Sequence, residues 1–493
     1  MHAVHLPFHV TITGMPQGLG AHPVVITIEL LLAAYFIIVN GIDFSLIAIA
    51  LWNMPRFLRV GAADALRRVT LPFARPVSVL LPVYNESAAV VDVVRSLLRL
   101  RYPTMELIVI NDGSTDETLQ LLEKAFELTP VFEAGYQAVR TKPVRGRYRS
   151  TKYPELRVVD KENGGKGDAL NAGLNEARYP LLLTGDGDSV YLADALEQMI
   201  QPFLEDPRTV ACGAGLRILN EAELVDGVPI PKALPRNLLV RFQVLEYLRS
   251  ALTSRFGWAP INGLMSISGA CGLWTKDIVV GAGGYLANTT WEDMEITVRV
   301  HHYMRDRGLP YRIAFVPAAV CWTTVPDSLE ALQGQRIGWH RHITETIMHH
   351  RNLMFSRRGG VAGWVALPAI ALIEWLSPIW MIGGLAFVIV AGWLGILSVY
   401  AQVALLALVF SLTILKSASA FLLDEVSYRT RRVSEVWALF LTAFLEQIGY
   451  RQLLAVWHLI GMVKFFAGRP IRGRTSDIPS WRDPPYRPVI SSS

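Results

Sequence analysis

Nearly continuous runs of hydrophobic residues occupy two parts of the chain, residues 24–52 and about 361–423. Each run is long enough to cross a bilayer at least once. Between them, residues 56 to about 350 have the charge density of a water-facing domain. The pattern predicts an N-terminal transmembrane helix within residues 1–55, a water-facing domain over 56–326 and a transmembrane helix pair within 361–435.

Three further segments have patterns of their own. Residues 327–360 place Leu332, Trp339, Ile343 and Ile347 on one helical stripe, which predicts an amphipathic helix at the membrane interface. Residues 436–466 are apolar but interrupted by charged residues, which favours an interfacial or re-entrant segment over another crossing. Residues 467–493 are rich in proline and serine and predict a disordered cytoplasmic tail.

Within the water-facing domain, short apolar runs alternate with helical patterns. The strands are expected at 77–81, 107–111, 156–160, 180–184, 210–213 and 312–316, and the helices at about 87–100, 115–128, 167–177, 192–204, 236–254 and 292–305. Strands separated by helices predict an α/β domain, in which a mainly parallel sheet carries helices on both faces. Residues 132–156 are expected to form a basic loop, either simply solvated or clamping lipid headgroups or substrate.

Charge and cysteine content indicate the orientation of the chain in the membrane and the state of its thiols. The formal charge is +5, and arginines follow the first hydrophobic run at positions 56, 59, 67 and 68. This bias predicts an external N-terminus and a cytoplasmic domain. Arginines near anionic lipid account for the positive charge without a nucleic-acid partner. Residues 1–23 lack charged side chains, which argues against a secretory signal. The spacing of the three cysteines fits no zinc site, so buried free thiols are expected.

The most informative chemical signal is Asp186-Gly187-Asp188, which directly follows the apolar run 179–185. A buried strand there delivers two carboxylates to its carboxyl end, where open α/β sheets bind ligands. Carboxylate oxygens suit Mg²⁺ or Mn²⁺ bridging a diphosphate. Asp-x-Asp also occurs in ordinary turns, so the signal depends on its companions.

An ordered set of short motifs accompanies this pair. They are Leu81-Pro-Val-Tyr-Asn-Glu86, Asn111-Asp112-Gly-Ser, Gly164-Gly-Lys166, Ser268-Gly-Ala-Cys-Gly272, Glu292-Asp293 and Gln335-Arg-Ile-Gly-Trp339. Their order and spacing over about residues 76–345 resemble the family 2 glycosyltransferases with the GT-A fold. Within that family the chain is most similar to the membrane-embedded synthases of poly-N-acetylglucosamine, chitin, hyaluronan and cellulose.

The resemblance implies a role for each motif. The uridine would be held by Tyr84, Glu86 and Asp112, with Lys166 approaching the nucleotide. Asp186 would lie near the ribose and diphosphate, and Asp188 would hold Mg²⁺ or Mn²⁺. Asp293, beside Glu292, would be the general base. Gln335 and Trp339, four residues apart on one helical face, would bind the acceptor, and Cys271 could belong to the acceptor wall.

Simpler interpretations stay open for the same residues. Asp112 could be a turn residue and Lys166 a surface lysine. Glu292 and Asp293 could only stabilise a helix N-terminus. Cys271 could be packing, and Trp339 could merely anchor its helix.

The motif around Trp339 departs from the family's usual Gln-x-x-Arg-Trp, because Gly338 stands at the arginine position. This change removes a cation expected near the diphosphate. Arg341, three residues further on, is the possible substitute, while Arg336 is expected to point away. A second departure is Trp291, where a small residue usually precedes Glu-Asp.

The resemblance thus implies a metal-dependent, inverting hexosyltransferase of the bacterial inner membrane. It would elongate a β-linked polysaccharide from UDP-GlcNAc or UDP-glucose and pass the glycan through its own helices, in contact with membrane lipids and possible export partners. One alternative is transfer of a single sugar to a lipid acceptor. Another is a catalytically weak scaffold or export partner, which Gly338 alone favours. The sugar, the linkage and the oligomeric state stay open.

Overall fold

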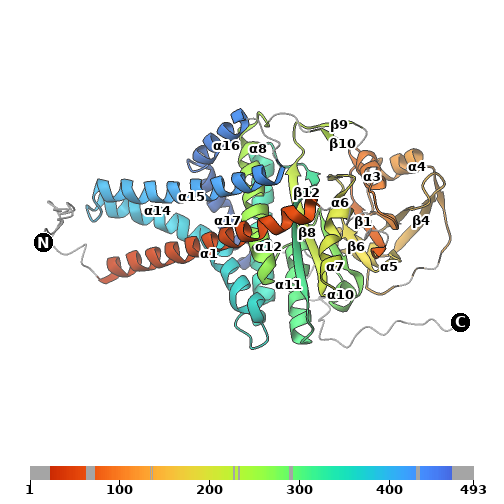
Figure 1. Ribbon diagram of the computed structural model, residues 1–493, viewed down its shortest axis with the longest axis horizontal. Helices are drawn as coiled ribbons and strands as arrows, with labels where there is room; N and C mark the ends of the chain where they lie inside the picture. Colours follow the sequence, from red (N-terminus) through yellow and green to blue (C-terminus); the bar gives the residue numbers. More distant parts are fainter. Residues whose placement is uncertain are drawn as a thin grey trace.

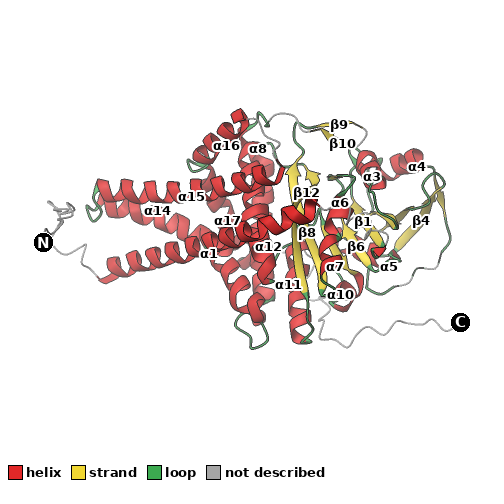
Figure 2. Ribbon diagram, viewed as in Figure 1, coloured by secondary structure: helices red, strands yellow, loops and turns green. Residues whose placement is uncertain are grey.

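The structure is a computed structural model that describes residues 23–62, 73–133, 135, 137–225, 228–230, 234–287, 292–428 and 433–468. The strands gather toward one side of the molecule, and long helices project from the other (Figures 1 and 2). The expectations for residues 1–22, Arg67, Arg68, Trp291 and residues 469–493 lie outside the described residues.

Four parallel strands form the centre of the first half of the sheet, in the order β5-β2-β1-β6. Their bounds are β1 Val77–Val83, β2 Met105–Asn111, β5 Leu156–Lys161 and β6 Leu181–Thr184. The connecting helices are α3 Val90–Leu98, α4 Thr118–Phe126 and α5 Lys166–Glu176. These strands are almost entirely buried because helices cover both faces, which explains their continuous apolar runs. The sequence predicted each of them.

The second half of the sheet corrects the expectation of a mainly parallel arrangement. Its strands are β7 Val190–Tyr191, β8 Thr209–Ile218, β11 Gly272–Thr275 and β12 Arg312–Thr323. β11 runs antiparallel to both β6 and β8, and β7 is antiparallel to β12. Of the nine pairings described in the ten-stranded sheet, four are parallel, so the sheet is mixed. The α/β fold class is confirmed.

The expected loop over 132–156 is also wrong in part. β4 (Val144–Ser150) pairs antiparallel with β5, and β3 (Leu128–Pro130) extends the sheet by pairing antiparallel with β4. β4 has no fully apolar face, because its arginines alternate with other half-buried residues. Arg147, for example, lies 2.8 Å from Glu176 of α5. A strand held by ion pairs and backbone hydrogen bonds lacks the hydrophobic alternation that would reveal it.

Further helices join the sheet to the rest of the chain. They are α6 Ala195–Met199, α7 Gln201–Glu205, α8 Leu238–Arg249, α9 Phe256–Trp258, α10 Lys276–Gly281, α11 Glu292–Asp306 and α12 Leu329–His349. α8 continues into a π-helical turn, η2, over Ser250–Arg255. α12 packs extensively against α17 (Tyr450–Phe466) and also contacts α11. A short two-stranded sheet, β9 Glu223–Val225 with β10 Val228–Ile230, lies apart.

In the described part of the chain, two helices are long and apolar enough to cross a membrane, Pro23–Leu58 within α1 (Pro23–Ala62) and Val399–Val426 within α15 (Val399–Tyr428). A third span results if two helices bent by 46° count together. This pair consists of Ala362–Trp375, which includes the π-helical turn η6 (Ala371–Trp375), and α14 (Ser377–Trp393). α16 (Val433–Leu445) and α17 are shorter. The division into membrane domains and the interfacial segments stay predictions.

Candidate active site

A cavity of about 460 Å³ lies between the sheet and the helices that lead to the membrane-length segments. Its walls include Asp186 and Asp188 after β6, Lys166 of α5, and Glu292 and Asp293 of α11. Opposite them stand side chains from α8, η2, α12 and η6, including Glu246, Arg255, Arg336, Trp339 and Glu374. Residues that lie far apart in the sequence, from Lys166 to Glu374, therefore line one cavity.

Asp188 has the environment of a metal ligand. Its carboxylate accepts hydrogen bonds from the hydroxyls of Ser189, at 3.2 Å, and Thr324, at 3.1 Å. Burial raises the pKa of Asp188, and the charge of Asp186 raises it further. A buried carboxylate crowded by another negative charge is stabilised when a divalent cation arrives. These residues therefore fit Mg²⁺ or Mn²⁺ held by Asp188 with Asp186 nearby.

Glu86 adds to this concentration of negative charge. Burial, and then the charges of Asp188, Asp116 and Asp186, raise the pKa of Glu86 to about 7. A Cβ at Gly187 would lie 3.0 Å from Cγ of Glu86, so Gly187 lets the two segments approach closely. Glu86 consequently stands beside the Asp-x-Asp turn, although it does not line the cavity.

Lys166 links two of the predicted site residues. Its Nζ lies 2.5 Å from Oδ1 of Asp186 and 2.7 Å from Oε1 of Glu292. Burial alone would lower the pKa of Lys166, but the charges of both carboxylates raise it, so the amine stays protonated. A Cβ at Gly269 would lie 2.7 Å from Nζ, so a larger residue there would displace the amine from its present position. Lys166 is therefore not an ordinary surface lysine.

The loop before α5 holds Lys166 in place through Asp112. Asp112 is buried; its carboxylate lies 2.7 Å from Nζ of Lys161 and accepts the backbone N–H groups of Gly164 and Gly165. Gly165 has a φ of +87°, which favours glycine. Asp112 thus shapes the turn into α5, and its contact with a uridine stays a prediction. Tyr84, half-exposed after β1, likewise lies outside the cavity lining.

Asp293 lies at the start of α11 and faces the cavity. One carboxylate oxygen accepts the N–H of Met294 at 2.7 Å, and the other accepts the N–H of Gly269 at 3.4 Å. Unlike its neighbour Glu292, it has no ion pair with Lys166. This position is suited to accepting a proton from a hydroxyl in the cavity.

One face of α12 closes the opposite side. Gln335 and Trp339, which were expected on one helical face, both line the cavity, and Oε1 of Gln335 has no hydrogen-bond partner among the described residues. Arg336 also lines it, which corrects the expectation that this side chain points away. Its guanidinium lies 4.3 Å from the ring centre of Trp339 and 2.5 Å from Glu246. A cation over an indole is a stabilising pair.

Two other expectations fail for reasons of packing. Arg341 does not line the cavity, because its part of α12 faces α17; a Cβ at Gly461 would lie 3.2 Å from the backbone nitrogen of Arg341. The contact of Arg341 with a diphosphate is therefore not supported. Cys271 is fully buried, with Sγ 3.3 Å from Sδ of Met199, so it packs in the core instead of forming the acceptor wall. All three cysteines are buried and unpaired, as expected.

The sequence analysis missed several cavity residues. Glu246 and Arg255 come from α8 and η2, and His342 from α12. The available signal was charge inside an otherwise apolar helical pattern, at positions 246, 249 and 255. Such charges are costly to bury without a function or a partner.

Together, an Asp-x-Asp turn after a parallel strand, a lysine bridging two carboxylates and a further carboxylate line one cavity at the edge of the α/β sheet. Residues 78–225 match the model of glycosyl transferase family 2.

The chain is similar to poly-beta-1,6-N-acetyl-D-glucosamine synthases. It is 29% identical over 263 residues to the protein of Staphylococcus aureus (strain COL), and 28% identical over 264 residues to that of Staphylococcus epidermidis. Each match covers 53% of this chain, and the chain spans about half the length of these curated relatives.

Among solved structures, a mannosyltransferase from Pyrobaculum calidifontis, in complex with GDP-Man and Mn²⁺, has a TM-score of 0.52 with this chain. The two share 16% sequence identity, over 88% of this chain and 99% of the other. This likeness shows a common fold.

Proposed function

We propose that the protein is a metal-dependent, inverting glycosyltransferase that elongates a β-linked polysaccharide from a UDP-sugar, with UDP-GlcNAc as the first candidate donor. The observation that carries this proposal is the shared cavity. Its lining brings together Asp188 and Lys166, which we assign to the donor, Trp339 and Gln335, which we assign to the acceptor, and Asp293, which we assign as the general base. The similarity to the staphylococcal synthases supports the choice of sugar.

The residues suit a direct displacement. The acceptor hydroxyl oxygen bonds to the anomeric carbon while the bond from that carbon to the diphosphate breaks, which inverts the configuration. Asp293 takes the proton of the attacking hydroxyl. Lys166 places a positive charge beside Asp186. A divalent cation at Asp188 would neutralise charge on the departing diphosphate.

The acceptor side of the cavity suits a glycan that continues toward the membrane-length helices. Trp339 offers an indole face and Gln335 an unsatisfied amide oxygen. Farther along, the wall includes Arg255, and Glu374 of η6 in the bent helix pair. A carboxylate within an apolar helix is a functional candidate by default. We infer a polar route for the product, in a multi-pass protein of the plasma membrane whose catalytic domain is cytoplasmic.

Apolar residues in the same wall, Trp258 and Ile370, favour the second candidate, transfer of one sugar to a lipid acceptor. Product size separates the two. A polymer supports the main proposal, whereas one added sugar on a lipid supports the second. The catalytically weak scaffold would release no UDP with any donor.

The test is UDP release by the full-length protein in detergent, against a panel of UDP-sugars with Mg²⁺ or Mn²⁺. We expect turnover with UDP-GlcNAc, stimulation by the cation and a product that grows with time. Asp188→Asn should remove the stimulation by metal. The matched control is Asp92→Asn on the exposed surface of α3, which should behave as the wild type. If Asp188→Asn has the same turnover and the same stimulation by the cation as the wild type, Asp188 does not hold the metal.

A further inference from the structure

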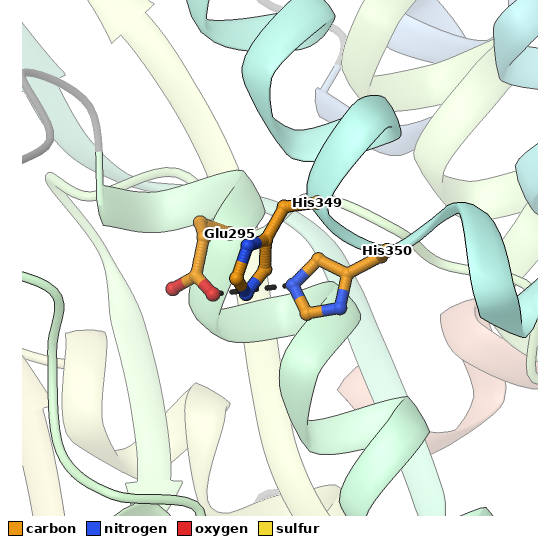
Figure 3. Close-up of side chains that lie close together, drawn as sticks. All are labelled: Glu295, His349 and His350. Carbon is orange, nitrogen blue, oxygen red and sulfur yellow. Dashed lines mark hydrogen bonds and ion pairs between the residues drawn. The ribbon is translucent and has the colours of Figure 1, made fainter. Parts of the chain in front are cut away.

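A second cluster of potential metal ligands lies outside the cavity. It consists of Glu295 of α11 and His349 and His350 at the end of α12. Their ligand atoms all lie within 4.8 Å of one another. Figure 3 shows the carboxylate and the two imidazoles turned toward one another across the two helices.

The contacts of Glu295 leave one oxygen directed at the histidines. Oε2 accepts a hydrogen bond from Nη2 of Arg299 at 2.7 Å, whereas Oε1 lies 3.2 Å from Nε2 of His350. Metal-bound carboxylates are commonly held by an outer hydrogen bond of this kind, which fixes their orientation. Arg299 therefore orients Glu295 toward the histidines.

Burial divides the cluster into a fixed and an adjustable part. Glu295 and His350 are buried, whereas His349 is exposed to solvent. The two imidazoles lie with ring centres 4.7 Å apart and almost perpendicular. An ion can therefore approach from solvent beside His349 and meet two ligands that are already in place.

Two imidazoles and one carboxylate form a donor set typical of Zn²⁺, with water completing a tetrahedron. Zinc ligands about 2.0–2.2 Å from the ion lie about 3.4 Å from one another. The pair His350–Glu295 is already at 3.2 Å. Only the exposed His349 has to move closer, by a rotation of its side chain. Imidazole nitrogen suits zinc better than Mg²⁺, which prefers oxygen ligands.

We propose that Glu295, His349 and His350 form a zinc site, separate from the Asp188 site. The ion joins α11 to the end of α12. Glu295 follows Asp293 by two residues on α11, and α12 carries Gln335, Arg336 and Trp339. The zinc site thus fixes the helix of the general base against the helix that faces the acceptor.

The test is zinc binding by the full-length protein in detergent, measured as bound metal per protein and by thermal unfolding with and without Zn²⁺. The wild type should bind one equivalent of Zn²⁺. His349→Ala should bind Zn²⁺ at least about tenfold more weakly. The ion should raise the unfolding temperature of the wild type but not of His349→Ala. Because His349 is exposed, this variant keeps the packing of the helices.

Two controls separate the sites. Arg351→Ala, beside the cluster and exposed, should keep the zinc. Asp188→Asn should keep it too, while losing its response to Mn²⁺. Co²⁺ is a second probe, because a tetrahedral nitrogen and oxygen site gives it visible absorption bands that His349→Ala should lack. The proposal is overturned if the wild type binds no zinc, or if His349→Ala binds it as tightly as the wild type.

Discussion

Replacing Lys166 with methionine should destabilise the protein through Glu292 more than through Asp186. In the native protein both carboxylates share the Lys166 amine. Methionine keeps most of the aliphatic stem but removes the charge. The two carboxylates would then face each other with no cation between them.

The size of the effect follows from exposure. The Lys166 and Asp186 side chains keep 31% and 28% of their accessible surface, whereas Glu292 keeps 3%. Asp186 can therefore be hydrated from the cavity, but Glu292 cannot. Removing one partner of a buried ion pair costs about 3–5 kcal/mol. Since one of the two carboxylates recovers water, we expect a loss near the lower end, about 3 kcal/mol.

A double-mutant cycle tests this estimate. Denaturant unfolding is measured in detergent for the wild type, Lys166→Met, Glu292→Gln and the double variant, with the exposed Lys124→Met on α4 as the control. Glu292→Gln removes the buried charge, so the double variant should recover at least half of the stability lost in Lys166→Met. Additive losses, or a Lys166→Met variant as stable as the control, would refute the idea that Lys166 neutralises Glu292.

Three further outcomes concern the reaction. Asp293→Asn should lower turnover by about 10²–10⁴-fold while calorimetry shows unchanged UDP binding, since a base acts on the acceptor proton; loss of UDP binding would exclude this role. Arg336→Ala should lower turnover at least about tenfold, whereas Arg341→Ala should stay within about twofold of the wild type. Gly338→Arg should raise turnover only in the Arg336→Ala background, because in the wild type we expect the Arg336 guanidinium to supply the positive charge that Gly338 lacks. Finally, the pKa of Glu86 is raised to about 7, so this carboxyl is protonated below that pH. A nearby cation favours the charged form, so the affinity for Mn²⁺ should rise as the pH rises through about 7. Glu86→Gln should lose this pH dependence. A pH-independent affinity in the wild type would contradict the last prediction.

The central strands could be predicted because their signal is local. β1, β2, β5 and β6 are apolar along their length, since helices cover both faces. β4 and β11 gave no such signal. β11 has only four residues, and its place between β6 and β8 is set by pairing with strands far away in the sequence. Short strands placed by distant partners cannot be found from periodicity alone.

The grouping of Asp186, Asp188 and Lys166 was predictable for a related reason. Residues that follow the ends of neighbouring parallel strands must meet at one edge of the sheet. Asp186 and Asp188 could therefore be placed before the structure was known, and Lys166 lies at the start of α5, the helix that leads from β5 to β6. The partner Glu292 could not be found without the structure, because the ion pair joins residues 126 positions apart in the sequence, 166 and 292.

The acceptor side was less predictable because a helix pattern does not say which arc of the helix faces the cavity. At about 100° per residue, positions 335, 336, 339, 342 and 343 fall within an arc of about 120°, and Arg341 falls outside it. The choice of arc is made by α17, which lies so close to α12 that Gly461 has no space for a Cβ beside Ile337 and His340. Because α17 packs against the arc of α12 around Ile337 and His340, the arc that carries Arg336 faces the cavity, and Arg341 lies outside that arc. We therefore expect Arg336, and not Arg341, to supply the positive charge that Gly338 lacks, which spacing within the motif alone could not identify.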